Sequence, residues 1–213
     1  MKFCVIGLGR FGYSVATVLA ENGVEVIAID NNESIVASIR DFVTQAICMR
    51  VTDEPSLRSV GIDEMDTVIV AMGENFAQSI LITAILKKKL NIPRVIARAI
   101  NDIHKDILKL VGADRIILPE KEIGIKIADI LSSPFLEIVR LTKTFAVAQI
   151  GAPKKFIGKS INELDLFNNY RVHCIGIKQD DVIHSLDPEY IVAEGAKLIF
   201  SGKNEYLEKI VKL

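Results

Sequence analysis

The chain lacks the features that mark membrane-spanning, secreted and nucleic-acid-binding proteins. None of its apolar runs reaches the roughly 18 residues that are needed to cross a bilayer. The N-terminus reads directly as a strand, so we expect no signal peptide. The 26 basic and 27 acidic residues leave a net charge of −1, which supplies no field to gather a phosphodiester backbone. We therefore expect a soluble, cytoplasmic protein without a nucleic-acid partner.

Cysteine and histidine are scarce and scattered. The chain has three of each, with no metal-ligand spacing among them: Cys4, Cys48, Cys174, His104, His173 and His184. Two of the cysteines fall in apolar runs that are typical of buried strands. We expect the cysteines to be core side chains and the histidines to be structural or exposed.

A glycine-rich motif near the N-terminus is the most informative feature that is present. The run CVIGLGRFG places Gly7, Gly9 and Gly12 between a β-branched strand over residues 2–6 and a helix over residues 10–21. Such glycines allow a tight turn and the close approach of an anion, and the N-terminus of the following helix favours negative charge. The motif predicts a phosphate-binding loop.

An acidic residue closes the next strand, which we place over residues 24–30. Asp30 lies where a carboxylate can accept hydrogen bonds from a ribose diol and would repel a 2′-phosphate. The pattern therefore favours NAD, ATP, ADP or AMP over NADP.

The alternation of strands and helices continues to residue 118. We expect strands over residues 42–49, 67–71, 95–99 and 115–118, separated by helices centred near residues 37, 57, 81 and 107. This order predicts an α/β fold with a doubly wound parallel Rossmann-type sheet.

Polar residues follow several of these strands, at the edge where such sheets bind ligands. The stretch RVTD comes after the third strand and MGEN, residues 72–75, after the fourth; Arg98 ends the fifth strand and Pro119-Glu120 follow the sixth. The predicted nucleotide-binding residues are Gly7, Leu8, Gly9, Arg10, Phe11, Gly12, Asp30, Asn31, Thr52, Asp53, Ala71, Met72, Gly73, Asn75, Arg98 and Glu120.

Two arginines fit a terminal phosphate. A cation at a helix N-terminus is unfavourable unless an anion is bound there, and Arg10 has this position. Arg10 and Arg98 could together clamp a phosphate, while Glu120 either balances the charge or helps to hold a divalent cation such as Mg²⁺.

The segment EKEIGIKIADIL, residues 120–131, is apolar on most sides of a helix, and Ser132, Ser133 and Pro134 should end it. We predict a crossover helix that packs against a second subunit; burial between two lobes of one chain is the alternative. We place a nucleotide-binding domain at residues 1–118, the crossover and dimerisation helix at 119–134 and a small α+β lobe at 135–213. In that lobe we expect strands within residues 137–144, 145–150, 171–178, 181–186 and 196–202, and a helix over residues 204–211.

The lobe offers no paired carboxylates and no nucleophile beside a base, so catalysis within this lobe has little support. The competing interpretation is an NAD-dependent oxidoreductase, in which His173 or His184 would act as acid or base. A nucleotide-sensing module of a transporter is a third possibility.

Several motifs together resemble the RCK family, the regulators of K⁺ conductance that are also called KTN domains. They are GLGRFG, VTDEPSL, VIVAMGEN, VIARAIND and GADRIILPEKEIG in the first part of the chain and GAKLIFSGK near its end. The length is most similar to the cytosolic subunit of bacterial Ktr-type potassium uptake systems, the KtrA kind, with TrkA proteins as longer relatives.

The resemblance implies a regulatory subunit that is not an enzyme. It implies dimers assembled into a ring, commonly an octamer, on the cytosolic face of a membrane K⁺-translocating subunit of the KtrB or TrkH kind. ATP against ADP, or NADH against NAD⁺, would change the ring. The glycine loop with Arg10 would bind phosphates, Asp30 the ribose, and Thr52 and Asp53 would lie near the adenine.

Further implications concern the terminal phosphate and the second lobe. The resemblance has Arg98 and Glu120 sense the terminal phosphate, although Ktr relatives often have a lysine where this chain has Arg98. Some relatives bind cyclic di-AMP in the second lobe through an arginine, and Phe167 takes that place here. The substitution argues against regulation by cyclic di-AMP.

Overall fold

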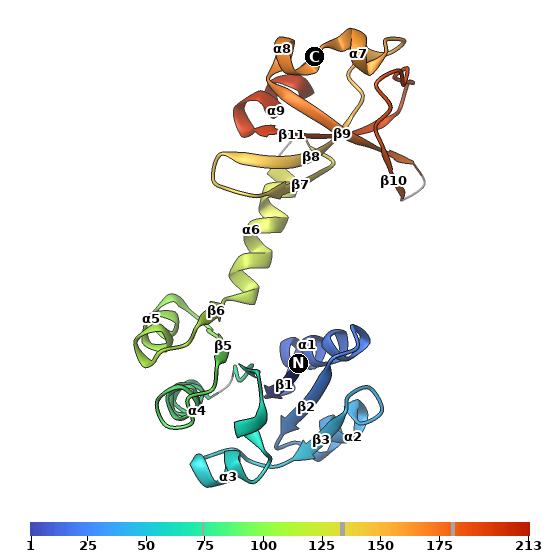
Figure 1. Cartoon of the computed structure of the whole chain (residues 1–213). Helices are drawn as coiled ribbons and strands as arrows, with labels where there is room; N and C mark the ends of the chain where they lie inside the picture. Colours follow the sequence, from blue (N-terminus) through green and yellow to red (C-terminus); the bar gives the residue numbers. More distant parts are fainter. Residues whose placement is uncertain (74, 133–134, 180–181) are drawn as a thin grey trace. The chain divides into compact units, whose positions relative to one another are not determined.

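The structure is a computed structural model that describes residues 1–73, 75–132, 135–179 and 182–213 (Figure 1). The chain divides into two compact units, Met1–Glu122 and Ile123–Leu213. Glu74 of the MGEN stretch and the expected helix stop at Ser133 and Pro134 lie outside the described residues.

The first unit is built on a six-stranded parallel sheet with the order β3-β2-β1-β4-β5-β6. Its strands are β1 (Lys2–Ile6), β2 (Glu25–Asp30), β3 (Gln45–Cys48), β4 (Thr67–Val70), β5 (Arg94–Arg98) and β6 (Arg115–Ile117). The order reverses between β1 and β4, which creates the switch point of a doubly wound sheet. The predicted Rossmann-type fold is confirmed.

Helices cover both faces of this sheet, because the strands between them are apolar on both sides. The helices are α1 (Arg10–Glu21), α2 (Glu33–Ile39), α3 (Glu54–Arg58), α4 (Phe76–Lys88) and α5 (Asp102–Val111), and a short 3₁₀ helix covers Ile62–Glu64. One core cluster joins Ala16 and Val36 to the sheet, and another joins Leu57, Ile82 and Leu108 to it.

Strand β3 is shorter than the expected 42–49. Only Gln45–Cys48 pair with β2, and Phe42 remains 57% exposed in the turn that follows α2. Because β3 is the edge strand of the sheet, Cys48 is exposed, so the expectation that it is a core side chain is wrong. Cys4 is buried as expected.

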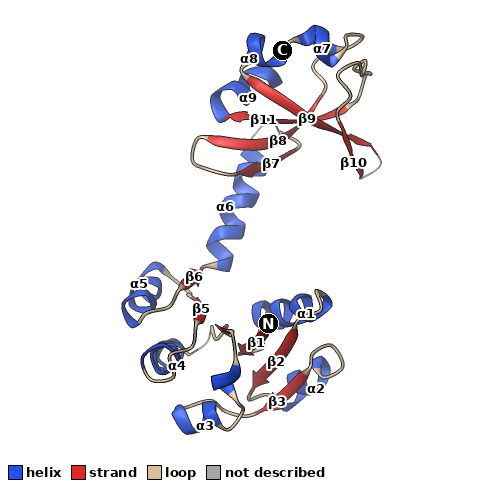
Figure 2. Ribbon diagram, in the orientation of Figure 1, coloured by secondary structure: helices blue, strands red, loops and turns tan. Residues whose placement is uncertain are grey.

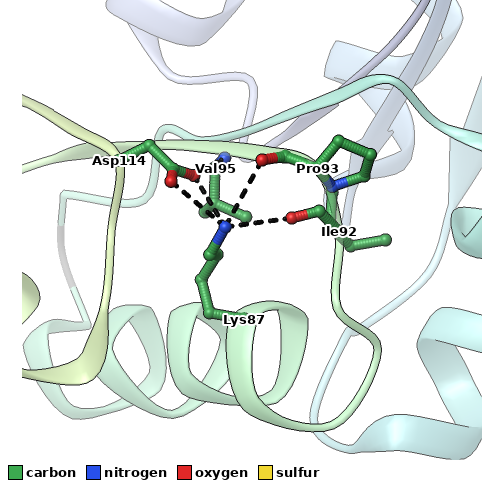
Figure 3. A network of polar contacts seen from close by, with 5 residues as sticks. All are labelled: Lys87, Ile92, Pro93, Val95 and Asp114. Carbon is green, nitrogen blue, oxygen red and sulfur yellow. Dashed lines mark hydrogen bonds and ion pairs between the residues drawn. The ribbon is translucent and has the colours of Figure 1, made fainter.

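Lys87 forms a polar network at the N-terminal ends of the parallel strands (Figure 3). The Lys87 Nζ donates to the carbonyl oxygens of Ile92 (3.1 Å) and Pro93 (3.4 Å) and to both oxygens of Asp114 (3.0 and 3.1 Å). Asp114 also accepts the Val95 N–H at 2.6 Å. The network therefore connects α4 to the residues that directly precede β5 and β6.

Helix α6 (Pro119–Ser132) carries its apolar residues on the outside. None of its residues is buried, and Ile123, Ile125, Ile127 and Leu131 keep 50% to 81% of their surface exposed. Asp129 in this helix pairs with Arg140, with Nε and Oδ2 2.7 Å apart, which fixes the last turns of α6 to the second unit.

The second unit contains a five-stranded antiparallel sheet with the order β10-β9-β11-β8-β7. Its strands are β7 (Glu137–Arg140), β8 (Phe145–Gly151), β9 (Val172–Gln179), β10 (Val182–Ser185) and β11 (Lys197–Lys203). Helix α9 (Asn204–Val211) packs against β8 and β11 through Leu207 and Ile210, both fully buried (Figure 2). These elements agree with the expected small α+β lobe.

Two short helices of this unit, α7 (Ile161–Leu164) and α8 (Leu166–Tyr170), escaped prediction, as did a 3₁₀ turn over Lys154–Phe156. A reciprocal capping box between Ser160 and Glu163 starts α7, and Asp165, with a φ of 41°, separates it from α8. Helices of four and five residues are too short to show a hydrophobic period.

Replacing Lys87 tests the polar network. We expect Lys87→Met to lower the free energy of unfolding of the first unit by about 1–2 kcal/mol, because partly buried carbonyl oxygens and Asp114 lose their donor. Partial burial of Asp114 raises the pKa of its carboxyl, but the hydrogen bonds from the Val95 N–H and Lys87 outweigh this effect and hold the pKa below its usual range. The stabilisation is therefore present at neutral pH and lost as the pH falls through that lowered pKa.

The measurement is chemical denaturation of both proteins between pH 7 and pH 3. Lys88→Met is the matched control, because Lys88 is exposed and has no polar partner among the described residues. An equal effect of the two substitutions would contradict the proposed role of the network.

Candidate nucleotide-binding site

A cavity of about 840 Å³ lies at the carboxyl ends of the parallel strands, at the switch point between β1 and β4. Its lining comes from the loops that follow β1, β2, β3 and β4, and from Arg98 and Glu120. The lining residues are Ile6, Gly7, Gly9, Arg10, Phe11, Ile29, Asp30, Asn31, Asn32, Ile35, Met49, Arg50, Val51, Ala71, Met72, Gly73, Asn75, Gln78, Arg98 and Glu120.

The glycine loop brings the start of α1 against the end of β1. Gly7 has a φ of +92°, in the left-handed region that favours glycine, and its N–H donates to the Ile29 carbonyl at 2.8 Å. A Cβ on Gly12 would lie 1.9 Å from the Gly7 carbonyl oxygen, so only glycine permits this approach. A Cβ on Gly9 would meet nothing within 4 Å, because Gly9 borders the cavity.

Helix α1 differs from its neighbours at the N-terminus. The side chains of Asn32, Asp53, Asn75 and Asn101 cap α2, α3, α4 and α5, whereas α1 begins after Gly9 without a side-chain cap. Its first turn also carries no acidic residue. The first N–H groups of α1 and the positive end of its dipole are therefore available to an anion in the cavity.

Asp30 links the glycine loop to the loop after β2. Its Oδ2 accepts the Leu8 N–H at 2.6 Å, and its Oδ1 accepts the Asn32 N–H at 2.8 Å. A carboxylate has about four acceptor sites, so each oxygen can accept one more hydrogen bond from a ligand hydroxyl. Leu8 itself is buried and does not line the cavity; it contributes through its backbone.

Arg98 and Glu120 form an ion pair at another part of the cavity wall. The Nη2 of Arg98 lies 2.5 Å from Oε1 of Glu120, and a Cβ on Gly73 would come within 2.4 Å of Nη1, so the guanidinium lies directly on Gly73. Its Nε is buried and has no partner among the described residues. The backbone N–H of Glu120, and after it Arg98, hold the pKa of this carboxyl below its usual range against partial desolvation.

Two further arginines line the cavity without a carboxylate partner in the part of the chain that the structure describes. Arg10 opens α1, and Arg50 follows β3; both are exposed. Three guanidinium groups against the carboxylates of Asp30 and Glu120 give the described lining of the cavity a net positive charge. This balance suits a ligand with several negative charges.

Twelve of the sixteen predicted site residues line the cavity, and Leu8, Gly12, Thr52 and Asp53 do not. Gly12 acts inside the loop, and Asp53 caps α3, where the Ser56 N–H is the main cause of its lowered pKa. The loop after β3 meets the cavity earlier, at Met49, Arg50 and Val51. The sequence could have indicated these three residues, because ligand contacts in such sheets begin directly at the carboxyl end of a strand.

The remaining missed residues, Ile6, Ile29, Asn32, Ile35 and Gln78, lie inside strands or helices or next to predicted positions. Glu120 was predicted to help hold a divalent cation. Within the described ranges no group of three or more His, Cys, Asp or Glu side chains could hold a metal ion. No described helix is long and apolar enough to cross a membrane.

Comparison with known proteins finds two domain families along the chain. Residues 3–119 match the TrkA-N domain, and residues 146–213 match the TrkA-C domain. The Ktr system potassium uptake protein A of Bacillus subtilis (strain 168) is 38% identical over 210 residues, which cover 98% of this chain and 94% of that protein. The Ktr system potassium uptake protein C of the same strain is 35% identical over 204 residues, which cover 94% and 92%.

Among solved structures, the GsuK RCK domain matches with a TM-score of 0.56 and 26% identity over 99% of this chain. The chain spans 46% of that structure's length. The GsuK channel bound to NAD matches with a TM-score of 0.53 and 27% identity over 99% of this chain and 38% of its own. GsuK bound to ADP matches with a TM-score of 0.54 and 27% identity over 62% of this chain and 34% of its own.

Two glycines separate loop packing from ligand binding. We expect Gly12→Ala to lower the thermal midpoint of the unliganded protein by about 5 °C or more, because its Cβ collides with the Gly7 carbonyl. Gly9→Ala should leave this midpoint unchanged and weaken nucleotide binding, because its Cβ enters only the cavity. Calorimetry of the unliganded and ligand-titrated variants measures both effects; a destabilised Gly9→Ala protein would contradict the assignment.

Proposed function

Because this chain belongs to the TrkA-N and TrkA-C family of Ktr and Trk potassium uptake proteins, we propose that it is a nucleotide-sensing regulatory subunit of a potassium uptake system. The observation that carries the proposal is the uncapped N-terminus of α1, which meets a cavity lined by Asp30 and Arg98. An adenine nucleotide, either ATP or ADP or NAD(H), is the proposed ligand. GsuK structures with NAD and with ADP support this ligand class.

The residues of the cavity fit such a ligand. The glycine loop and the first turn of α1 would hold phosphates, and the free acceptor sites of Asp30 would hold the ribose hydroxyls. The buried Nε of Arg98, which has no partner among the residues that the structure describes, offers a further donor. Asp30 disfavours a 2′-phosphate, so NADP is not expected to bind.

Arg98 can connect the ligand to helix α6. A terminal phosphate beside Arg98 competes with Glu120 for the guanidinium, and Glu120 lies in the first turn of α6. ATP and ADP differ in this phosphate, so they would differ in their effect on the ion pair. A ligand shifts a conformational equilibrium only by its differential affinity for the two states, and this competition provides such a difference.

The exposed isoleucines of α6 support the proposed assembly. We infer that residues 119–134 form a dimerisation helix between a nucleotide-binding domain, residues 1–118, and a second lobe, residues 135–213. Dimers would assemble into a ring, for which an octamer is the proposed form. The ring would dock, from the cytoplasm, on a membrane K⁺-translocating subunit and act as a regulator rather than an enzyme.

The test is a titration of nucleotide-stripped protein with ATP, ADP, NAD⁺ and NADH by calorimetry, with the particle mass followed by light scattering. The proposal expects unequal affinities for ATP and ADP, or for NADH and NAD⁺, and a particle of several subunits. Co-purification with a membrane subunit identifies the partner. Hydride transfer between NAD and a metabolite by the purified protein would contradict the regulatory role.

The γ-phosphate model makes a separate prediction. We expect Arg98→Ala to reduce the ratio of ATP to ADP affinity by about tenfold, because a charge-assisted hydrogen bond to the terminal phosphate is lost. Arg10→Ala should act in the same direction. Arg58→Ala is the control, because Arg58 pairs with Glu54 and Asp63 outside the cavity. An unchanged ratio in the Arg10 and Arg98 variants would refute the model.

A further inference from the structure

A chain of amide hydrogen bonds braces the cavity at the N-terminus of α4. The Nε2 of Gln78 donates to the Val51 carbonyl oxygen in a short contact. The Nδ2 of Asn75 donates to Oε1 of Gln78 at 3.1 Å, and the Gln78 backbone N–H donates to Oδ1 of Asn75 at 3.1 Å. All three residues line the cavity.

The chemistry of the partners fixes the orientation of both amides. The Val51 carbonyl can only accept a hydrogen bond, so the NH₂ group of Gln78 must face it and its oxygen must point away. The Gln78 backbone N–H can only donate, so the oxygen of Asn75 must face it. The NH₂ group of Asn75 then meets the oxygen of Gln78. Each bond requires the others in this direction, so the brace has one consistent arrangement.

The brace joins two loops that the sheet leaves unconnected. Val51 follows β3 and Gln78 lies in the first turn of α4, which follows β4, and β2 and β1 separate these two strands in the sheet. No ladder hydrogen bond can therefore fix the loop after β3 to α4. Gln78, which lies 27 residues from Val51 in the sequence, makes the connection with its side chain.

We propose that Gln78 is a positioning residue for nucleotide binding. Its side chain holds the loop formed by Met49, Arg50 and Val51 in the position at which this loop can contact the base and ribose of the ligand. The inference rests on the proposed nucleotide function. This loop lies next to β2, whose last residue, Asp30, is the proposed ribose ligand. Arg98, on β5, belongs to the opposite side of the switch point. Gln78 therefore serves the nucleoside part of the ligand.

This assignment predicts a distinct pattern across a ligand series. AMP, ADP and ATP share the nucleoside and differ in phosphate number, so loss of the brace should weaken all three by the same factor. The factor should be about three- to tenfold, as expected when one hydrogen bond that organises a site is lost. Loss of Arg98 should instead act most on ATP.

Two variants and one control make the experiment. Gln78→Met keeps the length and helix propensity and removes both side-chain hydrogen bonds. Gln78→Glu keeps an acceptor for Asn75 and removes the donor to Val51. Gln45→Met is the matched control, because Gln45 is exposed at the start of β3, at the end of the strand that lies away from the cavity. Affinities for AMP, ADP and ATP are measured by calorimetry, together with the thermal midpoint of each unliganded protein.

Each outcome decides the inference. An equal loss for the three nucleotides in Gln78→Met, with an unliganded midpoint close to that of the control, supports it. In Gln78→Glu the affinity for AMP should fall at least as much, and the added negative charge in the cavity should weaken ADP and ATP further. In Gln78→Met, unchanged affinities, a loss that grows from AMP to ATP, or a loss that appears only with a lowered midpoint would overturn it while the proposed function stands. A wild-type chain that binds none of the three nucleotides and neither NAD⁺ nor NADH would overturn both.

Discussion

The site depends on the close approach of α1 to the end of β1 at Gly12 and Gly7. The 1.9 Å between the Gly7 carbonyl oxygen and the place where a Cβ would stand leaves room only for hydrogen at Gly12. This contact directs the uncapped start of α1 into the cavity. It also brings the Leu8 N–H to Asp30, so that one carboxylate fixes the loop and still offers acceptor sites to a ligand.

The charges around the cavity follow from this placement. Side-chain caps satisfy the N-termini of the neighbouring helices, whereas α1 has no such cap and offers free N–H groups on one side of the cavity. Arg98 offers a guanidinium across the switch point. Arg98 has a carboxylate partner in Glu120, and its buried Nε has no hydrogen-bond partner in the described part of the chain. A buried donor without an acceptor is costly, so a bound anion lowers the free energy of this arrangement.

The fold and much of the cavity lining could be predicted because each rests on a local pattern. The strands of the parallel sheet are short, apolar and β-branched, and glycine spacing with Asp30 marks the loop. Thr52 and Asp53 do not line the cavity, because the loop after β3 reaches it one to three residues earlier, and Asp53 caps α3. Gln78 could not be predicted, since its role depends on Val51, a partner that only the tertiary fold brings near.

In the proposed assembly, helix α6 connects the ligand site to the subunit contact. Its first turn carries Glu120, the partner of Arg98, and its later turns expose Ile123, Ile125 and Ile127 to an extent of 50% to 56%. Burial of such side chains is worth about 25 cal/mol per Å² of apolar surface, so a subunit contact along this helix is favourable. When a phosphate replaces Glu120 at Arg98, the start of the same helix loses a hydrogen bond. In the proposed subunit, ligand identity and subunit contact would then be coupled through one element, and each would influence the other to the same extent.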